Sequence, residues 1–432
     1  MYQSAAASEL VPAARAARWN ATRLGTAVGV WIGLYPFADL AVRPKIGVFG
    51  GAGYMAGQTS PVLAMAQLAI LLLGIFPILA GVVILGVDFR RAKFFAASIF
   101  LFALSIPLSY LSMSDLSCFN FVVLIDYTIA CAILLVSTNV DREPLIRALL
   151  SAVALTLGVA MVAVLIDQDV VWGRLMGRTA PDYWGHLALS TILATLAMRG
   201  RVVRILLIAL SLTVMASTQS RSDIVSLAAG LSVAAVLFTR HPRVHRWVWI
   251  WFAAALGLVA AFGLGMNFIS NDLFRLSDPF RGAGTGFTGR SDLWRETWEI
   301  FASHPWLGVG YGQHAFHLST LIAGHNAYLA ALADTGIVGF LGYMIFFLGA
   351  LCRSLLQAWK EPTGDRIAIA AFLSAFAVIG LVEPTGFHTG NSFSMLTIFV
   401  AAWVWRTDYT GPAWIFAPDR QMRGVAVAAG SR

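Results

Sequence analysis

Charged residues are scarce in this chain of 432 residues, where Lys, Arg, Asp and Glu together make up 12%. A soluble domain carries roughly 25% charged residues, so the chain lacks the polar surface that a water-soluble fold requires. Soluble enzymes and disordered proteins are therefore excluded. Hydrophobic residues make up 58% of the chain and its mean hydropathy is +0.75, which leaves a polytopic membrane protein.

Cysteine is also scarce, with three residues and no CxxC motif. This pattern excludes a disulfide framework and a thiolate metal site. Alternating strands of about ten residues, the signature of an outer-membrane barrel, are lacking as well. The apolar runs are long, and in lipid a long apolar run satisfies its backbone hydrogen bonds as a helix. The sequence thus predicts an all-α fold, a polytopic transmembrane helical bundle.

The apolar runs predict about twelve spans. They lie at 24–42, 61–87, 93–113, 117–137, 147–167, 184–199, 202–217, 222–239, 247–268, 328–351, 366–385 and 391–406. The resulting organisation is a cytoplasmic N-terminal tail (1–23), nine helices (24–268), one long periplasmic loop (269–325), three helices (326–406) and a cytoplasmic C-terminal tail (407–432).

The net charge of +8 is best explained by orientation in a bilayer rather than by binding of nucleic acid. If the N-terminus is cytoplasmic, 21 of the 30 Lys and Arg residues fall in inner segments, and every inner loop is basic. Positive charge concentrates on the cytoplasmic side of membrane proteins. We therefore expect a multi-pass protein of the bacterial inner membrane with both termini in the cytoplasm.

The loop 269–325 is the only long segment between predicted spans, and long loops in compact proteins are usually functional. Within it, one helical face would carry the apolar and aromatic residues Leu293, Trp294, Thr297, Trp298 and Phe301. Such an amphipathic helix either lies at the membrane surface, with its Trp residues among the lipid headgroups, or packs on the bundle.

Three basic residues of the outer side share a context, since Arg221, Arg290 and His325 each stand at the start of a predicted helix. Free backbone N–H groups and a cation together form an anion site, and two such arginines suit a diphosphate. Alternatively, Arg221 reaches the interface and Arg290 pairs with a loop carboxylate such as Asp292. His325 is either an interfacial anchor or a general base, because histidine titrates near neutral pH.

Other polar residues were weighed beside these. Asn326 and Tyr328 could orient the His325 ring or a substrate hydroxyl. Asp126 and Glu383 lie within predicted spans, where carboxylates are functional or partnered, and Glu383 is near the outer end of its span. The loop histidines could bind a metal, but they lack an HExxH motif and an acidic partner at ligand spacing, so no metal site is predicted.

Four motifs in this part of the chain resemble those of the O-antigen ligase and polymerase superfamily. They are GRLMGRTAPDYWGHLA (173–188), STQSRSD (217–223), GRSDLWRETWEIFASHPWLGVGYG (289–312) and GHNAYLAALADTGIVGF (324–340). Asp182 stands where the family more usually has Asn. The resemblance covers about residues 172–345, and the first 150 residues match only as hydrophobic spans.

The resemblance implies an inverting glycosyl transfer at the periplasmic face that needs no metal or other cofactor. The donor would be a glycan on undecaprenyl diphosphate, and membrane lipids would surround the enzyme. By matching position, Arg221 and Arg290 would bind the diphosphate, and His325 would deprotonate or orient the acceptor hydroxyl. Arg174 and Arg178 are secondary candidates for the sugar or the lipid headgroup.

Two acceptors are compatible with this resemblance. A polymerase adds the chain to another lipid-linked glycan, whereas a ligase adds it to the lipid A-core. The short loop 168–183 favours a ligase. Arg174 and Arg275 each precede a glycine by eleven positions, a spacing similar to that of O-antigen polymerases, and we favour a polymerase. Polysaccharide export or chain-length proteins would then be partners. A secondary transporter is the alternative from another class.

Overall fold

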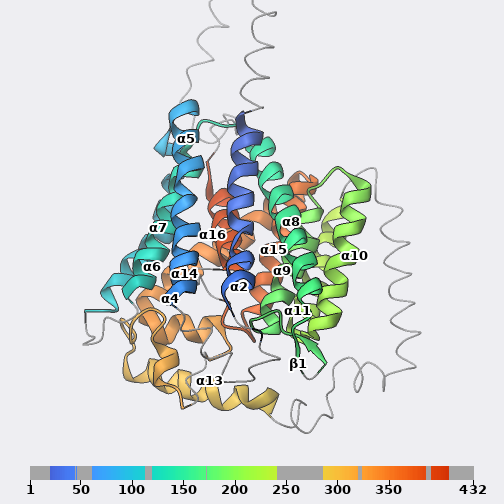
Figure 1. Ribbon diagram of the computed structural model, residues 1–432. Helices are drawn as coiled ribbons and strands as arrows, with labels where there is room; N and C mark the ends of the chain where they lie inside the picture. The colour runs from blue at the N-terminus through green and yellow to red at the C-terminus, as the bar shows by residue number, and fades with distance from the viewer. Residues whose placement is uncertain are drawn as a thin grey trace, which may run out of the picture.

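The computed structural model describes residues 20–43, 45, 61–111, 119–171, 173–240, 286–319, 324–385 and 391–407, and these residues are mostly helical (Figure 1). The first helical segment, Asn20–Val42, ends in α2 (Tyr35–Val42). The next elements are α4 (Pro61–Leu73), α5 (Ile75–Leu85), η1 (Phe89–Ala92), α6 (Lys93–Leu108), α7 (Phe119–Ser137) and α8 (Arg142–Asp167). The strands β1 (Val170–Val171) and β2 (Arg174–Leu175) follow, and then α9 (Pro181–Thr195), α10 (Arg201–Thr218) and α11 (Arg221–Phe238). The last elements are α13 (Gly286–Ser303), η4 (His314–His317), α14 (Ala327–Lys360), α15 (Gly364–Ile379) and α16 (Ser392–Trp405).

Seven helical segments of the described residues are long and apolar enough to cross a membrane. Eleven of the twelve predicted spans coincide with helices, and the twelfth, 247–268, lies outside the described residues. The helices α9, α15 and α16 have 15, 16 and 14 residues, fewer than the roughly 20 that span a bilayer. The protein is thus a membrane protein with transmembrane helices, while a count of twelve spans stays a prediction.

Small residues allow the helices to approach closely, as is common between membrane helices. The helix α11 packs on α15, where a Cβ on Gly230 would come within 2.8 Å of the Ala371 carbonyl oxygen. The helix α14 packs on α6, where a Cβ on Gly342 would come within 2.3 Å of the Phe102 backbone nitrogen. These two contacts bring the segments around the candidate site into one bundle.

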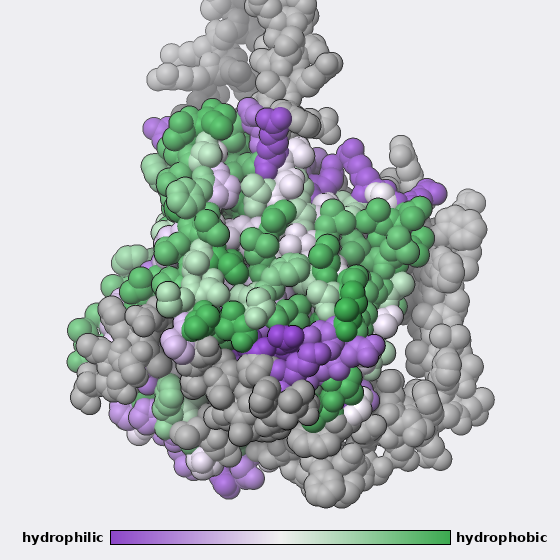
Figure 2. Space-filling model, viewed as in Figure 1, coloured by the Kyte–Doolittle hydropathy of each residue, from purple (hydrophilic) through white to green (hydrophobic). Residues whose placement is uncertain are grey.

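The surface of the bundle is apolar where lipid would cover it. Large apolar side chains such as Met65 and Val83 are 70% and 82% exposed on the segment Pro61–Leu85. Apolar residues cover the middle of the face seen in Figure 2, and hydrophilic residues gather above and below them. This banded surface agrees with helices that cross a membrane.

One end of the bundle carries the loop structure, and we call it the α13 end. The helix α13 lies across this end, at the bottom of Figure 1, and the β1–β2 hairpin lies at the same end near α10 and α11. The hairpin pairs Val170 with Leu175 and Val171 with Arg174 in antiparallel register. This hairpin was not predicted, because strands of two residues leave no periodic pattern in a sequence.

The helix α14 is interrupted near the α13 end. Gly336 has a φ of +62°, in the region that favours glycine, and it breaks the helical hydrogen bonding there. The loop before η4 replaces the missing bonds, because the Ile337 N–H donates to the Pro305 carbonyl (2.8 Å) and the Val309 N–H donates to the Ala333 carbonyl (2.9 Å). The interruption therefore fastens the loop to the start of α14, where the candidate site begins.

Candidate functional site

A single buried carboxylate, Glu383, gathers groups from several elements at the α13 end. It follows the end of α15 and is 3% exposed. Its Oε1 accepts hydrogen bonds from Arg290 Nη2 of α13 at 2.7 Å and from Ser222 Oγ of α11 at 3.0 Å. Its Oε2 lies 3.3 Å from His325 Nδ1, just before α14. The structure thus brings Arg290 and His325 together through a residue that the sequence did not assign to them.

Arg221 belongs to the same region. It is the first residue of α11 and is half-buried, directly before the Ser222 that binds Glu383. The N-terminus of a helix presents free N–H groups that suit an anion. The alternative partner considered for Arg290 is engaged elsewhere, because Asp292 pairs with Arg295 at 3.3 Å. Arg221 therefore adjoins, through Ser222, the group that gathers around the Glu383 carboxylate.

The backbone of His325 adopts an unusual conformation, with a φ of +47°. Residues other than glycine rarely occupy this left-handed region, so the surrounding contacts must hold it. Trp294 of α13 supplies one such contact, since its Nε1 donates to the His325 carbonyl at 3.1 Å. The His325 side chain is 26% exposed, so another molecule can reach the ring while Glu383 fixes one edge of it.

Asn326 and Tyr328 fasten α14 in place. Asn326 caps the helix, because its Oδ1 accepts from the backbone N–H groups of Tyr328 and Leu329 at 3.0 Å. Its amide donates to the Leu381 carbonyl, and the Tyr328 hydroxyl donates to the Ala377 carbonyl. These contacts favour a role in positioning His325, and the predicted contact with substrate stays a prediction.

Arg174 and Arg178 lie on the segment that contains the hairpin, and both contact carboxylates. Arg178 makes a bidentate pair with Asp167 at 2.8 and 3.0 Å. Arg174 donates to the Thr218 carbonyl at 2.8 Å, near the start of α11, and lies 3.4 Å from Asp182. Arg178 is thus tied to the end of α8, whereas Arg174 lies closer to the group around Glu383.

Three further predictions concern residues away from this group. Arg275 lies outside the described residues. Asp126 is half-buried within α7. His314 pairs with Asp334 at 2.8 Å, and His304 contacts the Ser303 hydroxyl. Within the part of the chain that the structure describes, no three His, Cys, Asp or Glu side chains come together as metal ligands do.

Electrostatics keep Glu383 ionised. Burial raises the pKa of this carboxyl, but the hydrogen bond from His325 and the positive charges of Arg290 and His186 outweigh burial and hold its pKa at about 2. A carboxylate beside a histidine fixes the tautomer and the orientation of the ring. At neutral pH, Glu383 therefore acts as a fixed anion that holds His325 through Nδ1.

The sequence singled out Glu383 as a carboxylate near the outer end of an apolar run, but it did not identify its partners. No role was predicted for Ser222, His186 or Asp223, although all three stand in the quoted motifs. The available signal was that Glu383 and three basic residues were all expected on one side of the membrane. Proximity between them was invisible, because Arg290 and Glu383 are 93 residues apart.

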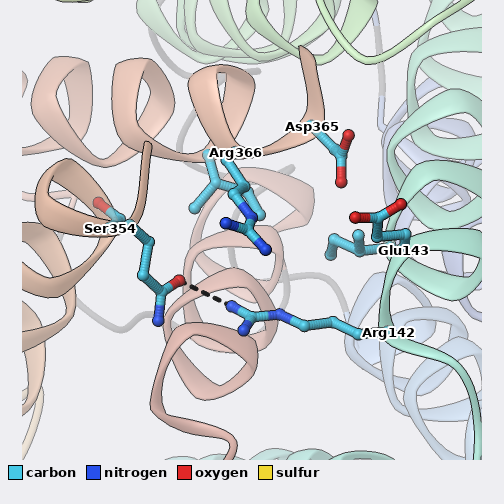
Figure 3. Close-up of a pocket in the computed structure, with 8 residues that line it drawn as sticks. Arg142, Glu143, Ser354, Asp365 and Arg366 are labelled. Atoms are coloured by element: carbon cyan, nitrogen blue, oxygen red, sulfur yellow. Dashed lines mark hydrogen bonds between the residues drawn. The ribbon is translucent and has the colours of Figure 1, made fainter. Parts of the chain in front are cut away.

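A pocket at the opposite end of the bundle does not resemble a substrate site (Figure 3). It lies between α8, α14 and α15, and Arg142 there donates to the Gln357 side chain at 2.8 Å. Glu143 and Asp365 balance the arginines that line it. Its cavity of about 10 Å³ has room for roughly one water molecule. We therefore place the candidate site at the α13 end.

Comparison with known proteins agrees with this placement. No curated protein matches the chain. The family model described as O-antigen ligase matches residues 206–344, a range that contains Arg221, Arg290 and His325. Glu383 lies beyond the matched range. Residues 206–344 therefore match an O-antigen ligase domain, and this match supports the resemblance to the O-antigen ligase and polymerase superfamily.

Proposed function

We propose that the protein transfers a glycan from undecaprenyl diphosphate to an acceptor hydroxyl during the synthesis of a surface polysaccharide, at the periplasmic face of the bacterial inner membrane. One observation carries the proposal: the Glu383 carboxylate joins Arg290 to His325 beside Arg221, and the three basic residues fall within the O-antigen ligase domain.

Arg221 and Arg290 would bind the diphosphate of the donor. Negative charge builds on the diphosphate as its bond to the sugar breaks, and fixed cations stabilise that charge. A guanidinium carries five N–H donors, so Arg290 can hold Glu383 and a phosphate oxygen together. In the proposed reaction the two arginines supply this charge, without a metal ion.

His325 would act on the acceptor. With Nδ1–H held by Glu383, its Nε2 is free to accept the proton of the acceptor hydroxyl. The hydroxyl oxygen forms a bond to the anomeric carbon while the bond from that carbon to the diphosphate oxygen breaks. A single displacement of this kind inverts the anomeric centre, and the proton remains on His325 until solvent removes it.

Removal of either arginine tests the proposal. Arg221→Ala and Arg290→Ala should each lower glycan transfer by about 10- to 100-fold, because each loses a charge-assisted contact of roughly 1.5–3 kcal/mol. Transfer from a purified lipid-linked donor to the acceptor is the measurement. Lys at either position should restore only part of the rate, because it cannot form a bidentate contact.

The control for these variants is Arg295→Ala. This arginine belongs to the same helix as Arg290, its side chain is 69% exposed, and it pairs with the exposed Asp292. It should retain nearly the full rate, since exposed ion pairs contribute little. An Arg290→Ala variant as active as Arg295→Ala would remove Arg290 from the leaving-group role.

The acceptor decides between polymerase and ligase, and we favour the polymerase. Purified protein given only the lipid-linked glycan should then produce a ladder of longer lipid-linked chains. A ligase would leave that glycan unchanged until lipid A-core is added. A secondary transporter would instead depend on groups near the bilayer midplane, so it should tolerate changes at Arg290 better than changes at Asp126.

The proposed side of the membrane has a test of its own. Reporter tags after Arg246 and after Lys360 should report cytoplasm, and a tag near Gly284 should report periplasm. Arg142 and Arg147 support this orientation, because they lie at the end of the bundle opposite α13. A cytoplasmic signal near Gly284 would invert the orientation and contradict a periplasmic site.

A further inference from the structure

A second buried pair of histidine and carboxylate adjoins the Glu383 group. His186 of α9 places its Nδ1 2.9 Å from Oδ1 of Asp223, in the first turn of α11. The carboxylate is fully buried, and the His186 side chain is 10% exposed. Asp223 directly follows the Ser222 that donates to Glu383. The two histidine–carboxylate pairs, His186–Asp223 and His325–Glu383, are therefore linked through one turn of α11.

Close packing fixes this second pair. Gly185 lies against the Asp223 side chain, and a Cβ on Gly185 would come within 2.0 Å of Asp223 Oδ2. The ring of Phe393 of α16 lies 5.0 Å from the His186 ring. The ring therefore has little freedom to turn away from Asp223. Its Nε2 makes no hydrogen bond to the residues that the structure describes.

Charged groups face His186 from several sides. Asp223 contacts it from α11, Asp182 lies nearby on α9, and Glu383 lies close enough that the charge of His186 lowers the pKa of Glu383. Arg290 faces it only across Glu383. Phe393 contributes no charge from α16. Burial opposes a charge on the ring, whereas these three carboxylates together outweigh burial and favour its positively charged form.

We propose that His186, as an imidazolium held by Asp223, donates a hydrogen bond from Nε2 to the leaving diphosphate and acts as a third group that binds it. This assignment rests on the proposed function. Arg290 shares its charge with Glu383, so the pair of arginines alone leaves much of the diphosphate charge uncompensated. A charge-assisted donor on the neighbouring helix would compensate more of it.

The two histidines then have opposite requirements. His325 must be neutral to accept a proton. His186 must be charged, because only the imidazolium carries a proton on Nε2 with which to donate a hydrogen bond to the phosphate oxygen. Binding of the diphosphate should therefore weaken as the pH rises and His186 loses its proton. The site would combine one base, His325, and one cation, His186, and each ring would be held by its own carboxylate.

The test is the binding of undecaprenyl diphosphate to the purified full-length protein, measured by native mass spectrometry at about pH 6 and about pH 9.5. The higher value lies well above the usual titration of histidine, because the carboxylates around His186 hold its charge to higher pH. The wild type should bind more weakly at the higher pH. His186→Gln cannot gain the charge, so at the lower pH it should bind about tenfold more weakly than the wild type. At the higher pH the two proteins should bind alike. All groups other than His186 are the same in both proteins, so the difference between them isolates His186.

His314→Gln is the matched control. His314 and Asp334 form another buried pair of histidine and carboxylate, with 2.8 Å between Nδ1 and Oδ1, and neither residue contacts Glu383 within the described residues. This variant should keep the wild-type dependence on pH. Asp223→Asn is the second variant if His186→Gln folds poorly, and it should move the weakening of binding to lower pH. A His186→Gln or an Asp223→Asn protein with wild-type binding at both pH values would overturn this assignment and leave the proposed function intact. A wild type that does not bind undecaprenyl diphosphate at either pH would instead count against the proposed function.

Discussion

Glu383→Gln should lower glycan transfer by about 10²–10⁴-fold, because the amide cannot replace a carboxylate that fixes a catalytic histidine. The glutamine can still accept a hydrogen bond from Arg290 or Ser222, but it loses the negative charge that faces Arg290 and His325. Its NH₂ group can also donate to His325 Nδ1, which would place the ring proton on Nε2. That tautomer cannot take a proton from an acceptor. Single-turnover transfer with donor at saturation measures the loss.

The control for this variant is Glu296→Gln. Glu296 lies on α13, the helix of Arg290, and is half-buried, and its carboxylate accepts hydrogen bonds from Ser319 at 2.9 Å. Its replacement should leave the rate close to that of the wild type. Equal rates for Glu383→Gln and Glu296→Gln would show that the buried carboxylate stabilises the structure without serving the reaction. Protein abundance and thermal stability, measured on both variants, separate a loss of fold from a loss of chemistry.

His325→Ala should lose about 10²–10⁴ in rate if His325 is the general base. His325→Gln can still form a hydrogen bond to a hydroxyl, but it cannot take up the proton at neutral pH. Gln should therefore be nearly as slow as Ala. If His325 instead positions the acceptor, the Gln variant would keep much of the rate, and the base assignment would be wrong.

The dependence on pH gives a second reading of His325. Activity of reconstituted wild-type protein should fall between neutral and mildly acidic pH if His325 is the base, since an imidazolium cannot accept a proton. Glu383 does not contribute to this fall, because its pKa of about 2 keeps it ionised throughout that range. Activity that rises on acidification would assign His325 to binding the diphosphate as a cation.

Within the described residues, the helices lie where the apolar runs predicted them, because a bilayer imposes length and hydropathy on each span independently of its neighbours. Features that depend on contacts between segments were harder to predict from the sequence. The helix α14 continues to Lys360 although the predicted span ended at 351, since its last turns pack beyond the apolar run. The interruption at Gly336 was not predicted either, because it requires the loop that bonds to it.

The candidate site shows the same division. Arg290 and His325 stand in motifs whose residues are adjacent in the chain, and the family match covers both. Glu383 stands outside the four motifs, and His186 stands in the motif 173–188, which lies before the matched range 206–344. Their roles follow from contacts between segments that are distant in the chain, since His186 and Asp223 lie 37 residues apart and His325 and Glu383 lie 58 residues apart. Tertiary packing decides such contacts, and one sequence does not record it.

The interruption of α14 at Gly336 also sets a rule for building chimaeras. The segment 305–310 and the segment 333–337 exchange backbone hydrogen bonds, so each completes the other. A loop transplanted from a relative without its matching stretch of helix would leave buried N–H and carbonyl groups without partners, each at a cost of about 1–3 kcal/mol. A Cβ on Gly336 would also come within 2.2 Å of the Trp306 backbone, so the two segments tolerate little independent change. In domain exchange or directed evolution, the two segments must therefore be transferred together, although about 23 residues of chain separate them.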